Sequence, residues 1–186
     1  MSIVITGNPG VGKHTTAELF IENVPDCHLV DINRVAIENG LAEKTTEGFE
    51  VDTTRVKTTI HKHMTRNSVV VGHLAPYVIN GSYINFVIVL RKNPYQLIEI
   101  YKQRGYGELK IKQNVGSEIL GVIANDSIAS FGKDKTFEID TTNRSPEEVV
   151  KVINELIDEK SIQKRDIIDW LTLVAEKNDM NRFFDY

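Results

Sequence analysis

Short apolar runs alternate along this chain with segments of helical period. The apolar runs are rich in β-branched residues and nearly continuous, which is typical of strands buried on both faces of a parallel sheet. They cover residues 2–6, 28–32, 68–72, 84–90 and 136–140. The helical pattern covers residues 13–23, 52–66, 94–104 and 109–131. It returns after the last run, where Ser145 is a candidate N-cap and Pro146 follows it.

This alternation predicts a three-layer α/β fold with a five-stranded parallel sheet flanked by helices. Ligands of such sheets bind at the carboxyl ends of the strands. We expect a main domain over residues 1–157 and a helical extension over residues 158–186. The apolar positions of the extension are Ile168, Leu171, Leu173, Val174, Phe183 and Phe184. They could pack on the domain or dock a partner, and the first alternative is favoured because amphipathic helices most often bury their apolar face at home.

The composition is that of an ordinary globular protein, with 41% hydrophobic and 26% charged residues among 186. The net charge of −4 does not favour direct, sequence-specific nucleic-acid binding. The single cysteine, Cys27, excludes an internal disulfide and fits a reducing compartment. No apolar run reaches the roughly 18 residues of a membrane span, and the first run is too short for a signal peptide. We expect a soluble protein of the cytoplasm, or also of the nucleus in a eukaryote.

The stretch GNPGVGKHTT follows the first predicted strand and opens the first predicted helix. In this context the backbone N–H groups of Gly10, Val11 and Gly12 can converge on phosphate oxygens, next to the positive end of the helix dipole. Lys13 supplies the charge that reaches the β- and γ-phosphates of ATP. A tight turn without a ligand is the alternative. The glycine spacing, the lysine and the strand–loop–helix context together favour a P-loop.

His14 occupies the position after the lysine, where a hydroxyl normally ligates Mg²⁺. The hydroxyl lies one place further on, at Thr15, which we take as the candidate metal ligand. Adenylate kinases commonly have Gly-Lys-Gly-Thr at this point, and the guanine-binding signature Asn-Lys-x-Asp does not occur in the sequence. The loop, with His14 and Thr15 as nucleotide-binding residues, therefore favours a small-molecule kinase over a switch GTPase.

Several segments together resemble the adenylate kinase isoenzyme six family, also called coilin-interacting nuclear ATPase. They are GNPGVGKHT, INRVAIENGL, FEVDTTRV, VVVGH, VIVLR and RGYGELKIKQNVGSEI, within about residues 1–157. The resemblance implies a nucleoside monophosphate kinase fold, with an acceptor-binding insert at about 31–52 and a short lid at about 103–113. It also implies adenylate kinase and ATPase activities with ATP, Mg²⁺ and AMP. The resemblance further implies a role in maturation of the small ribosomal subunit, through binding of ribosomal protein S11.

Further site residues follow from the P-loop and from the resemblance. Arg104 and Lys110 stand where a lid could close over transferring phosphates, so Arg104 is a candidate catalytic and ATP-binding residue. The resemblance places Arg144 at the adenine. It also places His73 at the ATPase step, which makes it a catalytic candidate, with a packed imidazole as the alternative. Arg91 ends the fourth strand and could meet a phosphate or an acidic partner.

The sequence departs from the family pattern at two further positions. Val71 stands where the family has a carboxylate that helps to hold the water shell of magnesium. Arg34 replaces an acid of the acceptor region. Asp31 and Asp52 are the alternatives for the missing carboxylate. Nucleotide binding is therefore expected, while the rate of turnover stays open.

These observations leave three functions to compare. The first is phosphoryl transfer from ATP to AMP with side ATPase activity, carried by Lys13, His73 and Arg104. The second is an ATP-gated assembly factor for ribosomal protein S11, whose basic character suits the acidic net charge. The third is a kinase of another metabolite on the same loop. AMP-dependent formation of ADP would favour the first function over the other two.

Overall fold

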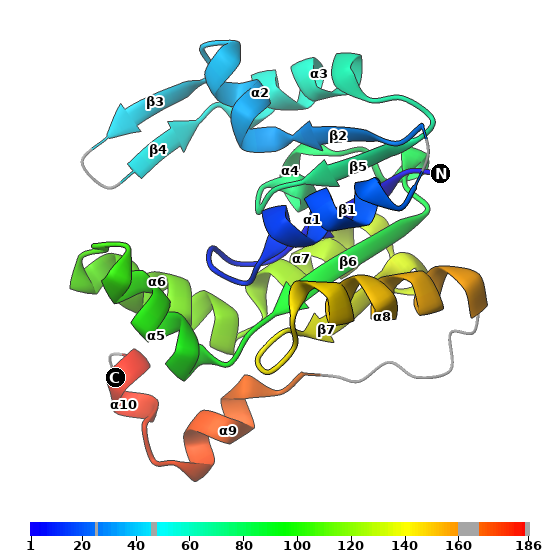
Figure 1. Cartoon of the computed structure of the whole chain (residues 1–186). Coiled ribbons are helices and arrows are strands. Elements are labelled where there is room, and N and C mark those ends of the chain that lie inside the picture. The colour runs from blue at the N-terminus through cyan, green and yellow to red at the C-terminus, as the bar shows by residue number, and fades with distance from the viewer. Residues whose placement is uncertain (25, 46–47, 160–167, 185–186) are drawn as a thin grey trace.

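Five short parallel strands form the central sheet (Figure 1). The structure is a computed structural model that describes residues 1–24, 26–45, 48–159 and 168–184. The strands are β1 (Ile3–Thr6), β2 (His28–Asp31), β5 (Ser68–Val71), β6 (Phe86–Arg91) and β7 (Thr136–Asp140). Their order across the sheet is β2-β5-β1-β6-β7, and every neighbouring pair is parallel. The predicted fold class and all five predicted strands are confirmed, and β1 lies at the centre.

Helices cover both faces of this sheet because successive residues of a strand point to opposite faces. Ile3 and Ile5 pack toward α1 (Lys13–Glu22) and α8 (Pro146–Glu159). Val4, between them, packs toward the helices of the other face. These are α3 (Thr53–His63), α4 (Ala75–Val78) and α7 (Val122–Phe131). The buried residues of the strands thus join two apolar clusters, one on each face.

The single helix predicted at 109–131 is wrong, because two helices occupy this stretch. They are α6 (Glu108–Ile119) and α7. Gly121 lies between them with a φ of 63°, a left-handed conformation that side chains rarely adopt. A Cβ at this position would also lie 3.3 Å from Nη1 of Arg91. The break is therefore set by glycine and by a side chain from β6, which the helical period alone does not show.

The segment expected to form the acceptor insert contains a helix and a hairpin that the sequence analysis did not predict. The helix is α2 (Ile32–Glu38), and its N-cap is Asp31, whose carboxylate accepts from the backbone N–H of Asn33 and Arg34. β3 (Ala42–Thr45) and β4 (Gly48–Val51) pair antiparallel as a separate two-stranded sheet. Two short 3-10 turns, η1 (Gly81–Tyr83) and η2 (Lys133–Lys135), precede β6 and β7.

The last described helices, α9 (Trp170–Glu176) and α10 (Met180–Phe183), lie against α6. Val174 and Phe183 are buried in the same cluster as α1 and α8, whereas Leu171 is exposed. The hydroxyl of Tyr95, on α5 (Pro94–Gln103), donates to Asp179 at 2.9 Å. The extension therefore buries part of its apolar face against its own chain. The charged stretch predicted to begin it lies mostly outside the described residues.

None of the helices in the described part of the chain combines the length and the apolar character that a membrane span requires.

Candidate active site

The predicted P-loop connects β1 to α1 at the centre of the carboxyl edge of the sheet, between the β3–β4 hairpin and the pair α5–α6 (Figure 1). Gly12 caps α1 with a φ of 97°, and Gly10 has a φ of 84°. At Gly7 a Cβ would lie 2.2 Å from the carbonyl oxygen of Leu90, so only glycine lets the loop pass β6 this closely. The glycines thus allow a loop that curls back over the end of the sheet.

Two hydroxyl groups fasten this loop from outside. The hydroxyl of Tyr101, on α5, donates to the carbonyl of Pro9 at 2.7 Å. The hydroxyl of Thr141, after β7, donates to the carbonyl of Val11 at 3.1 Å. The acceptor in both bonds is a backbone carbonyl oxygen of the loop. Fixing the carbonyls in this way preorganises the loop before a ligand arrives.

The bond from Tyr101 gives a stability prediction. We expect Tyr101→Phe to lower the free energy of unfolding by about 1–2 kcal/mol, because the ring is fully buried and the carbonyl of Pro9 loses the hydrogen bond from this hydroxyl. Urea denaturation followed by circular dichroism measures this change. Tyr106→Phe is the matched control, since its ring stacks on Tyr101 at 5.4 Å without a hydrogen bond of its hydroxyl in the described structure. Equal stability of Tyr101→Phe and Tyr106→Phe would show that the bond to Pro9 does not hold the loop.

Lys13 starts α1 with its ammonium group directed back into the loop. Nζ donates to the carbonyl of Asn8 at 2.8 Å, and the residue is only 6% exposed. Burial, and then the charge of the Arg104 guanidinium, lower the pKa of Lys13 to about 7. The carboxylates of Glu118 and Asp31 act in the opposite direction. A buried ammonium with so low a pKa is poised to gain stabilisation from an incoming anion.

His14 and Thr15 follow on the exposed side of α1. Nε2 of His14 lies 3.0 Å from Oδ2 of Asp31, at the end of β2. Burial by itself would raise the pKa of Asp31, but its hydrogen bonds with His14 and with backbone N–H groups outweigh this and lower it. Asp31 is therefore a carboxylate beside the P-loop. Asp52, the other alternative, caps α3 by accepting from the backbone N–H of Arg55 at 3.0 Å.

Magnesium would find a hydroxyl and a carboxylate here, at Thr15 and Asp31, which are the oxygen ligands that it prefers. Among the described residues, no three His, Cys, Asp or Glu side chains gather into a metal site. Val71 is fully buried in the apolar cluster on the α1 face. The donor set thus fits an ion carried mainly by nucleotide and water rather than by a protein cage.

His73 comes two residues after the end of β5, next to the central strand. Thr6 of β1 donates to the carbonyl of Gly72 at 2.9 Å and so fixes the start of this turn. Burial, and then the charges of Lys13 and His14, lower the pKa of His73 to about 4. Its imidazole is therefore neutral at physiological pH, and it lies within electrostatic reach of the P-loop lysine.

Arg104 ends α5 as an exposed residue whose charge acts on Lys13. Lys110, on α6, lies 4.4 Å from the ring centre of Tyr106, which in turn stacks on Tyr101. These contacts place the cations of the expected lid beside the P-loop. Arg144 is exposed, and its Nη1 donates to the carbonyl of Asp140 at 2.9 Å, at the rim of a cavity of about 400 Å³.

Arg91 meets acidic partners of its own chain, which decides between the two alternatives that the sequence left open. It is 3% exposed, and its Nε donates to Oε1 of Glu118 at 2.8 Å. Its Nη1 donates to Glu138 of the neighbouring strand. The guanidinium is thus buried and paired with carboxylates of its own chain.

Sequence reasoning missed the pairing of Asn8, a residue of the P-loop itself, with Glu118 of α6 beneath the loop. Nδ2 of Asn8 donates to Oε2 of Glu118 at 2.7 Å, and both side chains are buried. A signal was present, because Glu118 falls between Val115 and Ile119 on the apolar side of α6. A carboxylate on such a face requires hydrogen-bonding partners.

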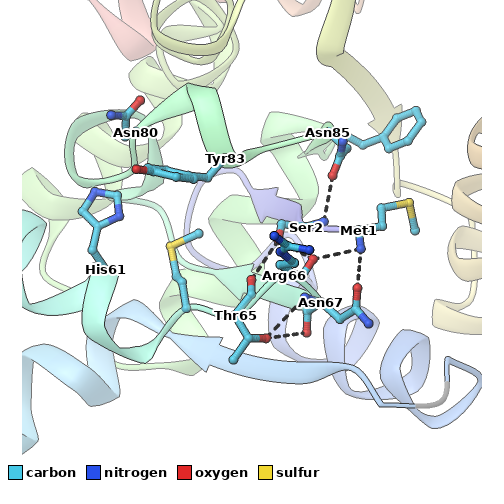
Figure 2. Close-up of a pocket in the computed structure, with 11 residues that line it drawn as sticks. Met1, Ser2, His61, Thr65, Arg66, Asn67, Asn80, Tyr83 and Asn85 are labelled. Atoms are coloured by element: carbon cyan, nitrogen blue, oxygen red, sulfur yellow. Dashed lines mark hydrogen bonds between the residues drawn. The ribbon is translucent and has the colours of Figure 1, made fainter.

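A larger cavity, of about 1020 Å³, opens at the other edge of the sheet (Figure 2). It lies where β1, β5 and β6 begin, with Ser2, Thr65, Asn67 and Asn85 among its lining. These polar groups bond to one another: Ser2 donates from its backbone to Asn85 at 2.9 Å and from its hydroxyl to Thr65 at 3.2 Å. The cavity thus lies at the amino ends of the strands, opposite the carboxyl edge that carries the P-loop.

Comparisons with known proteins agree with this geometry. The family model described as "AAA domain" matches residues 3–121. Proteins named "Putative adenylate kinase" are similar over most of the chain. The one from Saccharolobus solfataricus is 34% identical over 162 residues, covering 85% of this chain and 84% of that protein. The one from Thermococcus gammatolerans is 35% identical over 178 residues, covering 95% and 96%.

Among solved structures, shikimate kinases share the fold. The enzyme from Acinetobacter baumannii, in complex with shikimate, has a TM-score of 0.60 at 17% identity and covers 87% of this chain and 95% of its own. The enzyme from Aquifex aeolicus has a TM-score of 0.55 at 18% identity, covering 88% and 100%. The chain therefore belongs to the AAA domain family, as a kinase-type P-loop protein homologous to archaeal proteins named "Putative adenylate kinase".

Proposed function

We propose that the protein is a nucleoside monophosphate kinase that converts ATP and AMP into two ADP, with ATP hydrolysis as a side reaction. An oxygen of the AMP phosphate forms a bond to the γ-phosphorus, and the bond from that phosphorus to the β,γ-bridging oxygen breaks. ADP leaves with that bridging oxygen, and the accepting AMP becomes the second ADP. In the side reaction, water takes the place of AMP.

The observation that carries this proposal is the buried ammonium of Lys13 at the end of the P-loop. The hydrogen-bonding partner of this ammonium is the carbonyl of Asn8, at 2.8 Å. Phosphate oxygens would be stronger partners, because both groups of such a pair are charged. Loop N–H groups at Gly10, Val11 and Gly12 would cradle the same phosphates. Lys13 is thus the group that binds and neutralises the transferring phosphoryl group.

Arg104 and His73 would approach the same phosphates from two sides. The guanidinium of Arg104 is exposed and already acts on Lys13, so it can swing onto the oxygens of the transferring group as the lid closes. The neutral imidazole of His73 can accept a proton from, and so orient, an attacking water. Arg144 would lie beside the base of ATP.

Mg²⁺ bound with ATP would neutralise charge on the phosphates and hold them in line. In this proposal Thr15 supplies a hydroxyl, and Asp31 takes the place of the carboxylate that Val71 lacks. His14 orients Asp31 through the 3.0 Å contact. AMP would lie over the segment of α2, β3 and β4, where the exposed Arg34 could bind its phosphate.

The experiment is to follow ADP formation from ATP and Mg²⁺ by phosphorus NMR, with and without AMP. We expect two ADP to appear for each ATP consumed, and only when AMP is present. A metabolite kinase of another class would leave AMP unchanged. Free phosphate formed at the same rate with and without AMP would reject the kinase assignment in favour of an ATPase.

The second candidate is a weakly catalytic, ATP-gated assembly factor for ribosomal protein S11 in maturation of the small ribosomal subunit. It is favoured by the apolar, fully buried Val71 at a position where the resembled family has a magnesium anchor. Slow hydrolysis would then time the release of the partner. AMP-independent phosphate release that accelerates on addition of purified S11 would support this candidate. A cytoplasmic location suits either function, and the single cysteine, which fits a reducing compartment, supports it.

A further inference from the structure

Glu118 is the centre of a buried polar cluster beneath the proposed phosphate site. It is fully buried, and its carboxylate accepts hydrogen bonds from four donors. Oε1 accepts from Arg91 Nε at 2.8 Å, from the backbone N–H of Lys92 at 3.1 Å and from Trp170 Nε1 at 3.1 Å, and Oε2 accepts from Asn8 Nδ2 at 2.7 Å. These donors belong to the P-loop, the end of β6 and the start of α9. One carboxylate thus joins three segments that are far apart in the sequence.

Arg91 holds Glu118 in place. Its Nε donates to the carboxylate of Glu118, and its Nη1 donates to Glu138 of β7. Its Nη2 also donates to the backbone carbonyl of Glu118 at 2.7 Å. The guanidinium therefore fixes both the side chain and the backbone of Glu118 against the end of β6.

Asn8 connects Glu118 to the lysine of the P-loop, Lys13. Its side chain is held by Glu118 and accepts from the hydroxyl of Ser117 at 3.2 Å. Its backbone carbonyl accepts from Nζ of Lys13 at 2.8 Å. Because these bonds hold the side chain of Asn8, its backbone carbonyl points in one fixed direction. The hydrogen bond to this carbonyl then fixes the position of the ammonium group of Lys13.

We propose that Glu118 is a positioning residue of the proposed phosphate site that directs Lys13 through Asn8, and that Trp170 of the carboxyl-terminal extension takes part in this positioning through its bond to Glu118. This deepens the proposed function and rests on it. The extension then contributes to nucleotide affinity without touching the nucleotide.

The test compares Glu118→Gln with Glu138→Gln, which removes a carboxylate from the same ion-pair cluster. Lysine labelled with ¹³C at the ε-carbon reports the surroundings of Lys13 in the nucleotide-free protein, and the missing signal of Lys13→Met assigns it. We expect Glu118→Gln to shift and broaden this signal, because an amide nitrogen cannot accept from Asn8 and the carbonyl of Asn8 is then no longer fixed. We expect Glu138→Gln to leave the signal unchanged, because its bond is to Arg91.

ATP affinity at pH 7.5, measured by calorimetry, is the second readout. We expect Glu118→Gln to weaken it by up to about tenfold, the scale of one hydrogen bond that involves a charged group. We expect Trp170→Ala to change the signal of Lys13 in the same way, because the carboxylate of Glu118 then loses one of its donors. Leu171→Ala, an exposed neighbour on α9, should leave the signal and the ATP affinity unchanged.

Equal effects of Glu118→Gln and Glu138→Gln on the signal of Lys13 would overturn the proposal and leave the cluster a purely structural ion pair. Melting temperatures of the two variants show how much each change costs in stability alone. A wild-type protein that binds no ATP would refute the proposed function instead. In that event the labelled-lysine measurement still decides whether Glu118 positions Lys13.

Discussion

Replacing Lys13 with methionine is expected to abolish measurable ATP binding and turnover. Among the described residues, Lys13 is the only cation that the P-loop itself supplies, and its ammonium lies buried at the carbonyl of Asn8. Methionine keeps the length and packing of the side chain but removes the charge. Calorimetric titration with Mg²⁺-ATP measures the loss. The exposed Lys151→Met, on α8, is the control and should bind as the wild type does.

The same lysine predicts a pH dependence of binding. Its pKa is lowered to about 7 by burial and by the charge of Arg104, so above this pH the ammonium form becomes the minor one. A bound triphosphate favours the charged form, and binding at pH 8 should therefore take up a proton. Titration in two buffers with different ionisation enthalpies measures that uptake. Proton uptake that persists in Lys13→Met would assign it to another group and contradict this prediction.

The pH dependence of the free energy of unfolding is an independent test of the same pKa. Here the ammonium form of Lys13 is unfavourable, whereas in ATP binding it is favourable. The pKa of Lys13 is lowered from 10.5 in the unfolded chain to about 7 in the folded one. Between these values the unfolded state binds more protons, so stability rises with pH. Below pH 7 both states are charged and the full cost of burying the ammonium is present. We therefore expect Lys13→Met to be more stable than the wild type at pH 6, and the difference to disappear near pH 10.5.

The second large effect is expected at His73. We predict that His73→Ala lowers the rate of ATP hydrolysis by about 10²-fold, the scale of a positioned acid–base group, with ATP affinity little changed. The pKa of about 4 keeps the imidazole neutral, so it can accept a proton from water throughout the physiological range. The dependence of the rate on His73 should accordingly stay constant from pH 5 to 8.

Steady-state hydrolysis with malachite green detection of phosphate measures this effect. His63→Ala is the matched control, because it removes an exposed histidine from the end of α3. A His73→Ala protein with wild-type hydrolysis would remove this residue from the mechanism. Loss of AMP phosphorylation without loss of hydrolysis would instead assign His73 to the acceptor side.

The sequence by itself determined the sheet and the place of the phosphate site. Continuous β-branched runs are stable only as strands covered on both faces, and Ile3–Thr6 is such a run. Gly10, Gly12 and Lys13 form a pattern that depends on local backbone geometry, so it predicts a phosphate site without knowledge of the tertiary structure. The P-loop and the parallel sheet could therefore be predicted from nearest neighbours along the chain.

Only the tertiary structure decided which charges reach the loop. Arg91 and Glu118 are 27 positions apart, and Trp170 is 52 positions from Glu118, so no local pattern pairs them. Burial also changes what a residue type can do. The same packing lowers the pKa of Lys13 to about 7 and that of His73 to about 4. The hydrophobic periodicity predicts which residues lie at the carboxyl edge of the sheet. Desolvation and long-range contacts determine the charge of their side chains and where these side chains point.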